Sequence, residues 1–130
     1  MASSDTRTPV HRAVGLGSAK SGSAHWWSQR ITAAALVPLM LWLTGSLISL
    51  AGRDYHAFIG WLHNPITVVL LSLLLIALFR HTVLGLEVIA EDYIHARGLR
   101  IVTIGLLRFA GVILAASGIF AMLVIAFGGY

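Results

Sequence analysis

Four ionisable side chains lie inside apolar segments of this sequence: Arg80, His81, Glu87 and Arg108. Ionisable groups are unfavourable in an apolar surrounding, so each of the four is a candidate for binding or for proton transfer. An imidazole can ligate a metal or carry a proton, and a carboxylate can relay a proton or pair with a cation. What these residues do depends on the depth and direction at which their surrounding elements hold them.

His81 is the most informative of the four. It lies about 12 residues before Tyr93, or roughly 18 Å along a helix axis, near the middle of a bilayer and out of reach of water. At that depth a histidine can hydrogen-bond a neighbouring helix, ligate a haem iron or relay a proton, and spacing alone leaves all three open. Gly85, one turn away, leaves room for a flat macrocycle, and Arg80 is placed to meet a haem propionate.

A haem at His81 would need a second axial ligand from another polypeptide. The reason is that the other candidate histidines lie near or outside the ends of the apolar segments, namely His25, His56, His63 and His95. A haem hypothesis therefore implies a partner membrane subunit.

Glu87 and Arg108 have simpler alternatives. Arg108 lies near the start of its apolar segment, so its long side chain can extend to the lipid headgroups. Glu87 lies about 1.5 turns from the end of its helix, where it can reach the interface, pair with a neighbour or relay a proton.

Three apolar segments hold these residues, and each is long enough to cross a bilayer as a helix. They are predicted at Ile31–Leu50, Ile66–Ala90 and Ile101–Phe127, and Pro38 predicts a kink in the first. No period-two alternation of apolar and polar residues indicates strands. Because the connections are short, consecutive helices are expected to be antiparallel. The sequence therefore predicts an all-α integral membrane protein with three transmembrane helices in an up-down-up arrangement.

The polar segments set the domain boundaries and the orientation. Residues 1–24 are predicted to be an extended cytoplasmic tail and residues 25–130 a three-helix membrane anchor domain, with connections at Ala51–Pro65 and Glu91–Arg100. Basic residues are retained on the cytoplasmic side of a membrane. Only Arg53 lies on one side, whereas the other side carries Arg7, Arg12, Lys20, Arg30, Arg97 and Arg100. This asymmetry predicts a cytoplasmic N-terminus and a periplasmic C-terminus.

Composition restricts the class of protein. Hydrophobic residues make up 58% of the 130 positions and charged residues 11%, which is more apolar surface than a soluble domain of this size can bury. The formal net charge is +4, but the basic residues gather at the ends of apolar segments and form no patch for nucleic acid. The absence of cysteine excludes iron–sulfur ligation and a thiol nucleophile on this polypeptide.

Two stretches resemble a known family. Arg80–Tyr93 (RHTVLGLEVIAEDY) carries the pattern H-x3-G-x6-D-Y, and Gly15–Gly22 (GLGSAKSG) precedes His25–Ala33 (HWWSQRITA) at the first span. Together they resemble the small hydrophobic membrane anchor subunit of succinate dehydrogenase, particularly its alphaproteobacterial members. The resemblance covers nearly the whole sequence in length, span number and order.

The resemblance implies roles for individual residues. His81 matches the axial ligand of a haem b that is shared with a partner anchor. Tyr93 matches a tyrosine that hydrogen-bonds a ubiquinone carbonyl oxygen, and Asp92 matches the acid beside it. Arg30 matches an arginine near the haem propionates, and His25 is a looser match for a propionate contact. The remaining candidates are Arg80 and Gly85 for the haem pocket and Glu87 for a proton relay.

The resemblance also implies a complex in the bacterial inner membrane. Its other members would be a second membrane anchor subunit (cytochrome b556), an iron–sulfur subunit and a flavoprotein subunit, so FAD and the clusters would lie outside this polypeptide. Succinate would be oxidised in the partner subunits and ubiquinone reduced at a site to which this protein contributes. Two alternatives are a haem-bearing anchor of fumarate reductase or another quinone oxidoreductase, and a small transport protein in which Arg80, His81 and Glu87 form an ion path.

Overall fold

The structure is a computed structural model that describes residues 19–128, with side chains described from residue 22. It contains four helices and, in the part of the sequence described, no strand: α2 (Ala19–Leu50), α3 (Tyr55–Leu62), α4 (Pro65–Tyr93) and α5 (Arg97–Phe127). Three of them are long and apolar enough to cross a membrane. The predicted all-α fold with three membrane-spanning helices is therefore confirmed.

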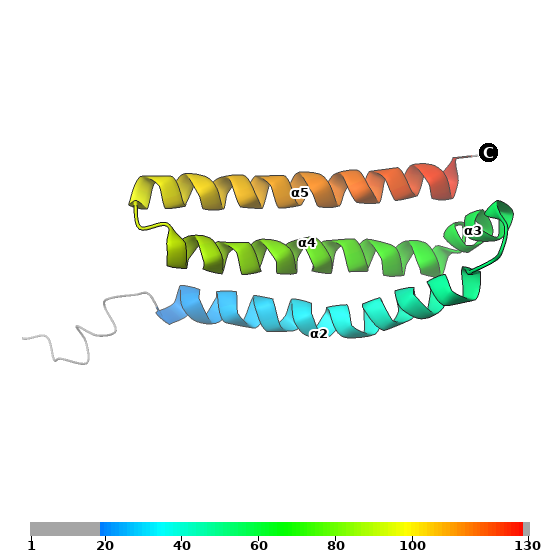
Figure 1. The fold of residues 1–130 in the computed structure, drawn as a ribbon, viewed down its shortest axis with the longest axis horizontal. Helices are drawn as coiled ribbons and strands as arrows, with labels where there is room; N and C mark the ends of the chain where they lie inside the picture. Colours follow the sequence, from blue (N-terminus) through cyan, green and yellow to red (C-terminus); the bar gives the residue numbers. More distant parts are fainter. Residues whose placement is uncertain (1–18, 129–130) are drawn as a thin grey trace, which may run out of the picture.

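The three long helices lie side by side with α4 in the middle (Figure 1). Helix α4 packs against both α2 and α5, and consecutive long helices run in opposite directions. The N-terminal end of α2 therefore lies at the same end of the molecule as the α4–α5 connection (Figure 1). Since α4 has a neighbour on each side, it contributes most of the buried residues and is the element best placed to hold polar groups away from lipid.

Local sequence explains where α3 and α4 begin. Asp54 caps α3 by accepting a hydrogen bond from the backbone N–H of Ala57 at 3.0 Å. Asn64 caps α4 in the same way, and Pro65, which has no N–H to leave unsatisfied, occupies the first turn. Gly52, in the turn after α2, has a φ of +78°, which a residue with a side chain rarely adopts.

The connection predicted at Ala51–Pro65 contains a further helix, α3, that the apolar segments do not predict. This helix is too short to span a bilayer, so a search for membrane-length apolar segments passes over it. It packs against α4 and α5, and Trp61 stacks on Trp42 of α2 with 5.9 Å between ring centroids. The signal for this helix is Asp54, a turn or helix-start residue directly before a largely apolar octamer.

The remaining helix bounds extend beyond the predicted spans. Helix α2 begins at Ala19, so residues 19–24 of the predicted tail are helical, and the α4–α5 connection shortens to residues 94–96. Apolar segments mark only the hydrocarbon part of a helix, whereas backbone hydrogen bonding continues into the interface. Helix α2 continues through Pro38 and its axis bends (Figure 1). Residues 1–18, with Arg7, Arg12 and the start of the Gly15–Gly22 motif, lie outside the described residues.

Helix α4 packs closely against α5. A Cβ on Gly111 of α5 would collide with the Val83 side chain, so glycine is required for this approach. At the far end, Val68 packs with Met122 and Ala126 in an apolar cluster. The polar residues of α4 lie toward the opposite end, near the α4–α5 connection (Figure 1).

Candidate functional site

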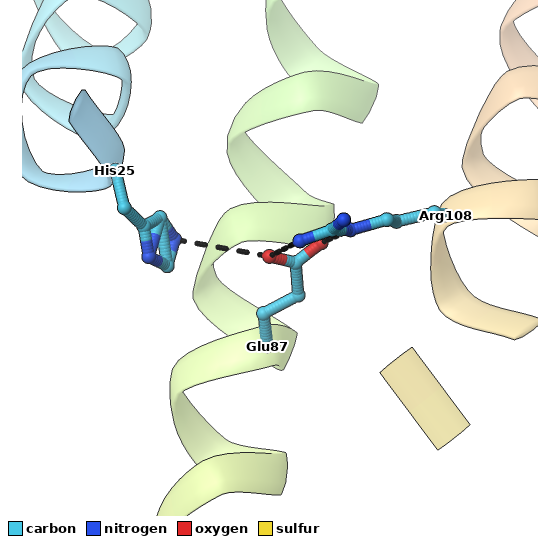
Figure 2. Close-up of polar contacts among 3 residues, drawn as sticks. All are labelled: His25, Glu87 and Arg108. Atoms are coloured by element: carbon cyan, nitrogen blue, oxygen red, sulfur yellow. Dashed lines mark hydrogen bonds and ion pairs between the residues drawn. The ribbon is translucent and has the colours of Figure 1, made fainter. Parts of the chain in front are cut away.

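Glu87 and Arg108 form an ion pair that joins α4 to α5 (Figure 2). Arg108 donates from Nε to Oε1 of Glu87 at 2.6 Å and from Nη2 to Oε2 at 3.0 Å, so both carboxylate oxygens are held. The Glu87 side chain is only 3% exposed, and a two-point charged contact of this kind is strong and directional. Of the alternatives open to Glu87, the structure shows pairing with a neighbour, and the guanidinium of Arg108 is directed at that carboxylate.

His25 approaches the same carboxylate from α2 (Figure 2). Its Nε2 lies 4.0 Å from Oε2 of Glu87, and this nitrogen is a buried polar atom without a hydrogen-bond partner in the described part of the protein. Buried polar atoms are normally satisfied, so an unpartnered one points to a missing neighbour such as a ligand, a water or another subunit. All three long helices therefore converge on Glu87.

An open cleft of about 450 Å³ surrounds this cluster. Its polar lining combines guanidinium, carboxylate and imidazole groups on three helices, so it can hold a charged or hydrogen-bonding group. The lining residues from α4 recur at helical spacing and form one face of that helix: Arg80, Leu84, Glu87 and Glu91. The other lining residues are Gly22, Ala24, His25 and Ser28 from α2, and Arg108 from α5.

His81 makes its contact on a different face of α4. Its Nδ1 lies 3.0 Å from the Thr32 hydroxyl of α2, and that hydroxyl also lies 2.9 Å from the Ser28 carbonyl oxygen and 3.0 Å from the Gln29 carbonyl oxygen. Gly85, one turn along α4, has no atom within 4 Å of the place where a Cβ would stand. No side chain of the described residues therefore fills the position beside Gly85.

The structure does not bring all the haem-pocket candidates together. Arg80 lines the cleft, but it lies about 140° around α4 from Gly85, so the two residues serve different faces. The Arg30 guanidinium lies over the Trp26 ring at 4.4 Å from its centroid, a cation–π contact between two exposed residues within α2. Of the predicted candidates, only His25, Arg80 and Glu87 share the cleft.

The quinone-site candidates lie at the end of α4. Tyr93 is the last residue of the helix and is 80% exposed, and Asp92 before it is also exposed. Within the described residues neither side chain has a hydrogen bond or an ion pair, and neither lines the cleft. Both groups are therefore free to contact something outside this polypeptide.

Two contacts at the site were predicted in kind but not in their partners: His81 hydrogen-bonds a neighbouring helix through Thr32, and Glu87 pairs with a neighbour, Arg108. Thr32 lies two turns after His25, so the two residues share one face of α2. Both contact α4, and their spacing is the sequence signal for this shared face. For the ion pair, Glu87 is the single acid in its predicted span and Arg108 is the single base well inside the next. Two opposite charges in neighbouring spans favour pairing, so the signal for this contact is present in the sequence.

Comparison with known proteins agrees with this architecture. Residues 4–115 match the family described as succinate dehydrogenase/fumarate reductase transmembrane subunit. The chain is 41% identical over 96 residues to a succinate dehydrogenase hydrophobic membrane anchor subunit of Rickettsia bellii, covering 74% of this chain and 77% of that relative. It is 38% identical over 95 residues to the succinate dehydrogenase membrane anchor subunit of Reclinomonas americana, covering 68% of this chain and 77% of that relative.

A third relative extends over more of the sequence. The hydrophobic membrane anchor subunit of succinate dehydrogenase from Paracoccus denitrificans is 27% identical over 113 residues, or 85% of each of the two sequences. These matches confirm the resemblance drawn from the two sequence motifs. With its three apolar helices and a family match over most of its length, the chain belongs to the succinate dehydrogenase/fumarate reductase transmembrane subunit family.

Proposed function

We propose that this protein is the small anchor of a succinate:ubiquinone oxidoreductase, that it shares a haem b with a second anchor subunit, and that it contributes to the ubiquinone-reduction site. The family match supports the anchor role. The observation that carries the haem assignment is His81, an imidazole inside the middle helix whose Nδ1 contacts Thr32, with open space beside Gly85.

The donor set of the protein fits a haem that is shared between two subunits. His81 would hold the iron, and within the described residues its Nε2 has no hydrogen-bond partner. Arg30, His25 and Arg80 are the candidates for the propionates, and His25 has the stronger support because its buried Nε2 has no hydrogen-bond partner. When bound, the haem supplies reversible one-electron transfer. The protein itself binds and orients the group.

Ubiquinone would meet the protein at the end of α4. The Tyr93 phenol is a neutral hydrogen-bond donor at a membrane surface, suited to a quinone carbonyl oxygen, and its exposure leaves room for a quinone and for a partner subunit to cover it. Asp92 is adjacent and can pass protons from water during reduction. Arg108 holds both Glu87 oxygens, and His25, at 4.0 Å, is the titratable neighbour through which a proton relay at Glu87 could run.

The same proposal sets the orientation. Basic residues gather at the end of the molecule where α2 begins and where α4 connects to α5, so this end faces the cytoplasm of a bacterial inner membrane and the C-terminal end faces the periplasm. An iron–sulfur subunit and a flavoprotein subunit would dock on the cytoplasmic side, where Tyr93 lies. These partners would carry the FAD, the clusters and the succinate-oxidising chemistry.

Substitution of His81 tests the haem assignment. In the purified complex, His81→Ala is expected to abolish the low-spin b-type absorption spectrum, because the imidazole that would hold the iron is removed. The matched control is His63→Ala, which changes an exposed histidine at the other end of the molecule and should leave the spectrum unchanged. An unaltered haem spectrum in His81→Ala would refute the assignment.

A fumarate reductase anchor is the second candidate, because the matching family is described by both enzyme names. Purification of the complex distinguishes the two by direction of turnover: succinate-dependent ubiquinone reduction supports the first candidate, and quinol-dependent fumarate reduction without it supports the second. The ion-path alternative gains no support from the geometry, since Glu87 is held by Arg108 and His81 contacts Thr32 on another face of α4.

A further inference from the structure

We infer that Thr32 is a positioning residue for His81: its hydroxyl accepts a hydrogen bond from Nδ1–H, which fixes the imidazole tautomer and leaves Nε2 as the nitrogen that binds iron. The inference rests on the haem ligation proposed above. It concerns a residue of α2, the helix that neighbours the one carrying the ligand.

The contact itself is direct. Thr32 Oγ1 and His81 Nδ1 are 3.0 Å apart, both side chains are partly buried, and the two residues come from different helices. The contact links a side chain of α2 to a side chain of α4 with no residue between them. It therefore holds the ring of His81 relative to α2 as well as to α4.

The direction of the hydrogen bond follows from the number of protons. A hydroxyl has one proton to donate and two lone pairs to accept with. The Thr32 hydroxyl has two backbone carbonyl oxygens within reach, of Ser28 at 2.9 Å and of Gln29 at 3.0 Å, and neither can donate. When the proton is directed at these carbonyls, as is usual for threonine within a helix, Oγ1 can only accept from His81. Nδ1 then carries the ring proton.

This tautomer is the one that a metal ligand requires. A neutral imidazole has one protonated nitrogen and one with a free lone pair, so a proton on Nδ1 leaves the lone pair on Nε2. In metal sites, the hydrogen bond made by the non-ligating ring nitrogen fixes the orientation of the ring and raises its basicity as a ligand. The opposite tautomer, with Nδ1 accepting from Thr32, would protonate Nε2 and block ligation.

The test compares three substitutions on α2 in the purified complex. Thr32→Val removes the hydroxyl with little change of shape, Thr32→Ser keeps it, and Thr44→Val removes a hydroxyl that donates to the Met40 carbonyl oxygen of the same helix. The measurements are the midpoint potential of the haem by redox titration and the fraction of haem retained in detergent.

We expect Thr32→Val to shift the midpoint potential upward and to weaken haem retention by about tenfold or more, because a less basic imidazole stabilises ferric iron less. Thr32→Ser and Thr44→Val should match the unsubstituted complex. If Thr32→Val retains haem at an unchanged potential, the inference is wrong. If that variant fails to assemble with its partner subunits, the comparison of Thr32→Ala with Thr32→Ser decides in the same way.

The outcome also separates this inference from the proposed function. Absence of haem from the unsubstituted complex, or an intact haem spectrum in His81→Ala, contradicts the ligation itself. A haem that depends on His81 and is indifferent to the Thr32 hydroxyl contradicts only the positioning role.

Discussion

Tyr93 combines a polar group with an exposed position at the end of a membrane helix. Aromatic residues are common at membrane interfaces, where the ring packs among headgroups and the hydroxyl reaches water. A quinone-binding tyrosine differs from an interfacial anchor in one respect, which is that its hydroxyl has a specific acceptor. Removal of that hydroxyl alone therefore distinguishes the two roles.

We predict that Tyr93→Phe lowers ubiquinone reduction by about tenfold, because one hydrogen bond to the substrate is worth about 1 kcal/mol or somewhat more. Haem content should be unchanged, since the substitution lies well away from His81 along α4. Steady-state quinone reduction and the haem spectrum are the two measurements. Tyr55→Phe, another exposed tyrosine, is the control, and normal turnover in Tyr93→Phe would contradict the quinone role.

For single residues, the sequence predicts the place along a helix better than it predicts which residue of another helix is contacted. The depth of His81 and its place one turn from Gly85 are predicted by counting residues along one helix. The contact of His81 with Thr32 depends on how far α2 is shifted along α4. That register is set by the turn at Gly52 and by α3, whose geometry no residue count supplies.

Among the elements, α4 connects the other two long helices. Thr32 and His25 of α2 approach it on one side, and Arg108 of α5 on the other. The Glu87–Arg108 pair holds α4 to α5 at the polar end, and the close approach at Gly111 supports the same contact. Pairing also offsets the desolvation cost that a single buried carboxylate would carry.

We predict that Arg108→Met destabilises the complex by about 2 kcal/mol or more, because it leaves the Glu87 carboxylate buried without a partner. The double substitution Glu87→Leu with Arg108→Met should recover much of that loss, since no charge remains. Thermal unfolding of the purified complex measures both. Arg97→Met at the exposed start of α5 is the control. Equal losses in the single and double variants would show that the pair does not couple the helices.

The long helices and the short one differ in how well the sequence predicts them, for a physical reason. Apolar length identifies a membrane span reliably, so all three long helices are confirmed. A short interfacial helix such as α3 has no comparable signature, because its stability comes from packing on α4 and α5 and not from its own length.

The three long helices form a row in which α4 packs against both α2 and α5, and the short helix α3 lies at one end of it (Figure 1). Most large apolar side chains of α2 and α5 are exposed in the isolated protein, as expected of helices that face lipid or a partner anchor. The cleft is open, so its polar lining is not enclosed by this protein alone. The side of the membrane on which this end of the molecule lies is a central property of the proposal.

Single-cysteine labelling tests that orientation, and the protein is suited to it because its sequence contains no cysteine. In spheroplasts, a membrane-impermeant maleimide is expected to label His63→Cys, on the predicted periplasmic side. It should label Ala96→Cys, in the α4–α5 connection, only after the membrane is opened with detergent. The reverse pattern would overturn the orientation and move Tyr93 away from the cytoplasm.

Because α4 contacts both other long helices, the spacing of residues along it tolerates less change than the identity of most of its side chains. His81 must face Thr32 while Glu87 faces Arg108 and Tyr93 ends the helix, and all three conditions refer to one rigid rod. Inserting one residue between His81 and Glu87 would turn the two positions by about 100° relative to each other and separate them by a further 1.5 Å or so. Many side chains here can be exchanged without that effect. The spacing between the three positions is what an insertion or deletion cannot preserve.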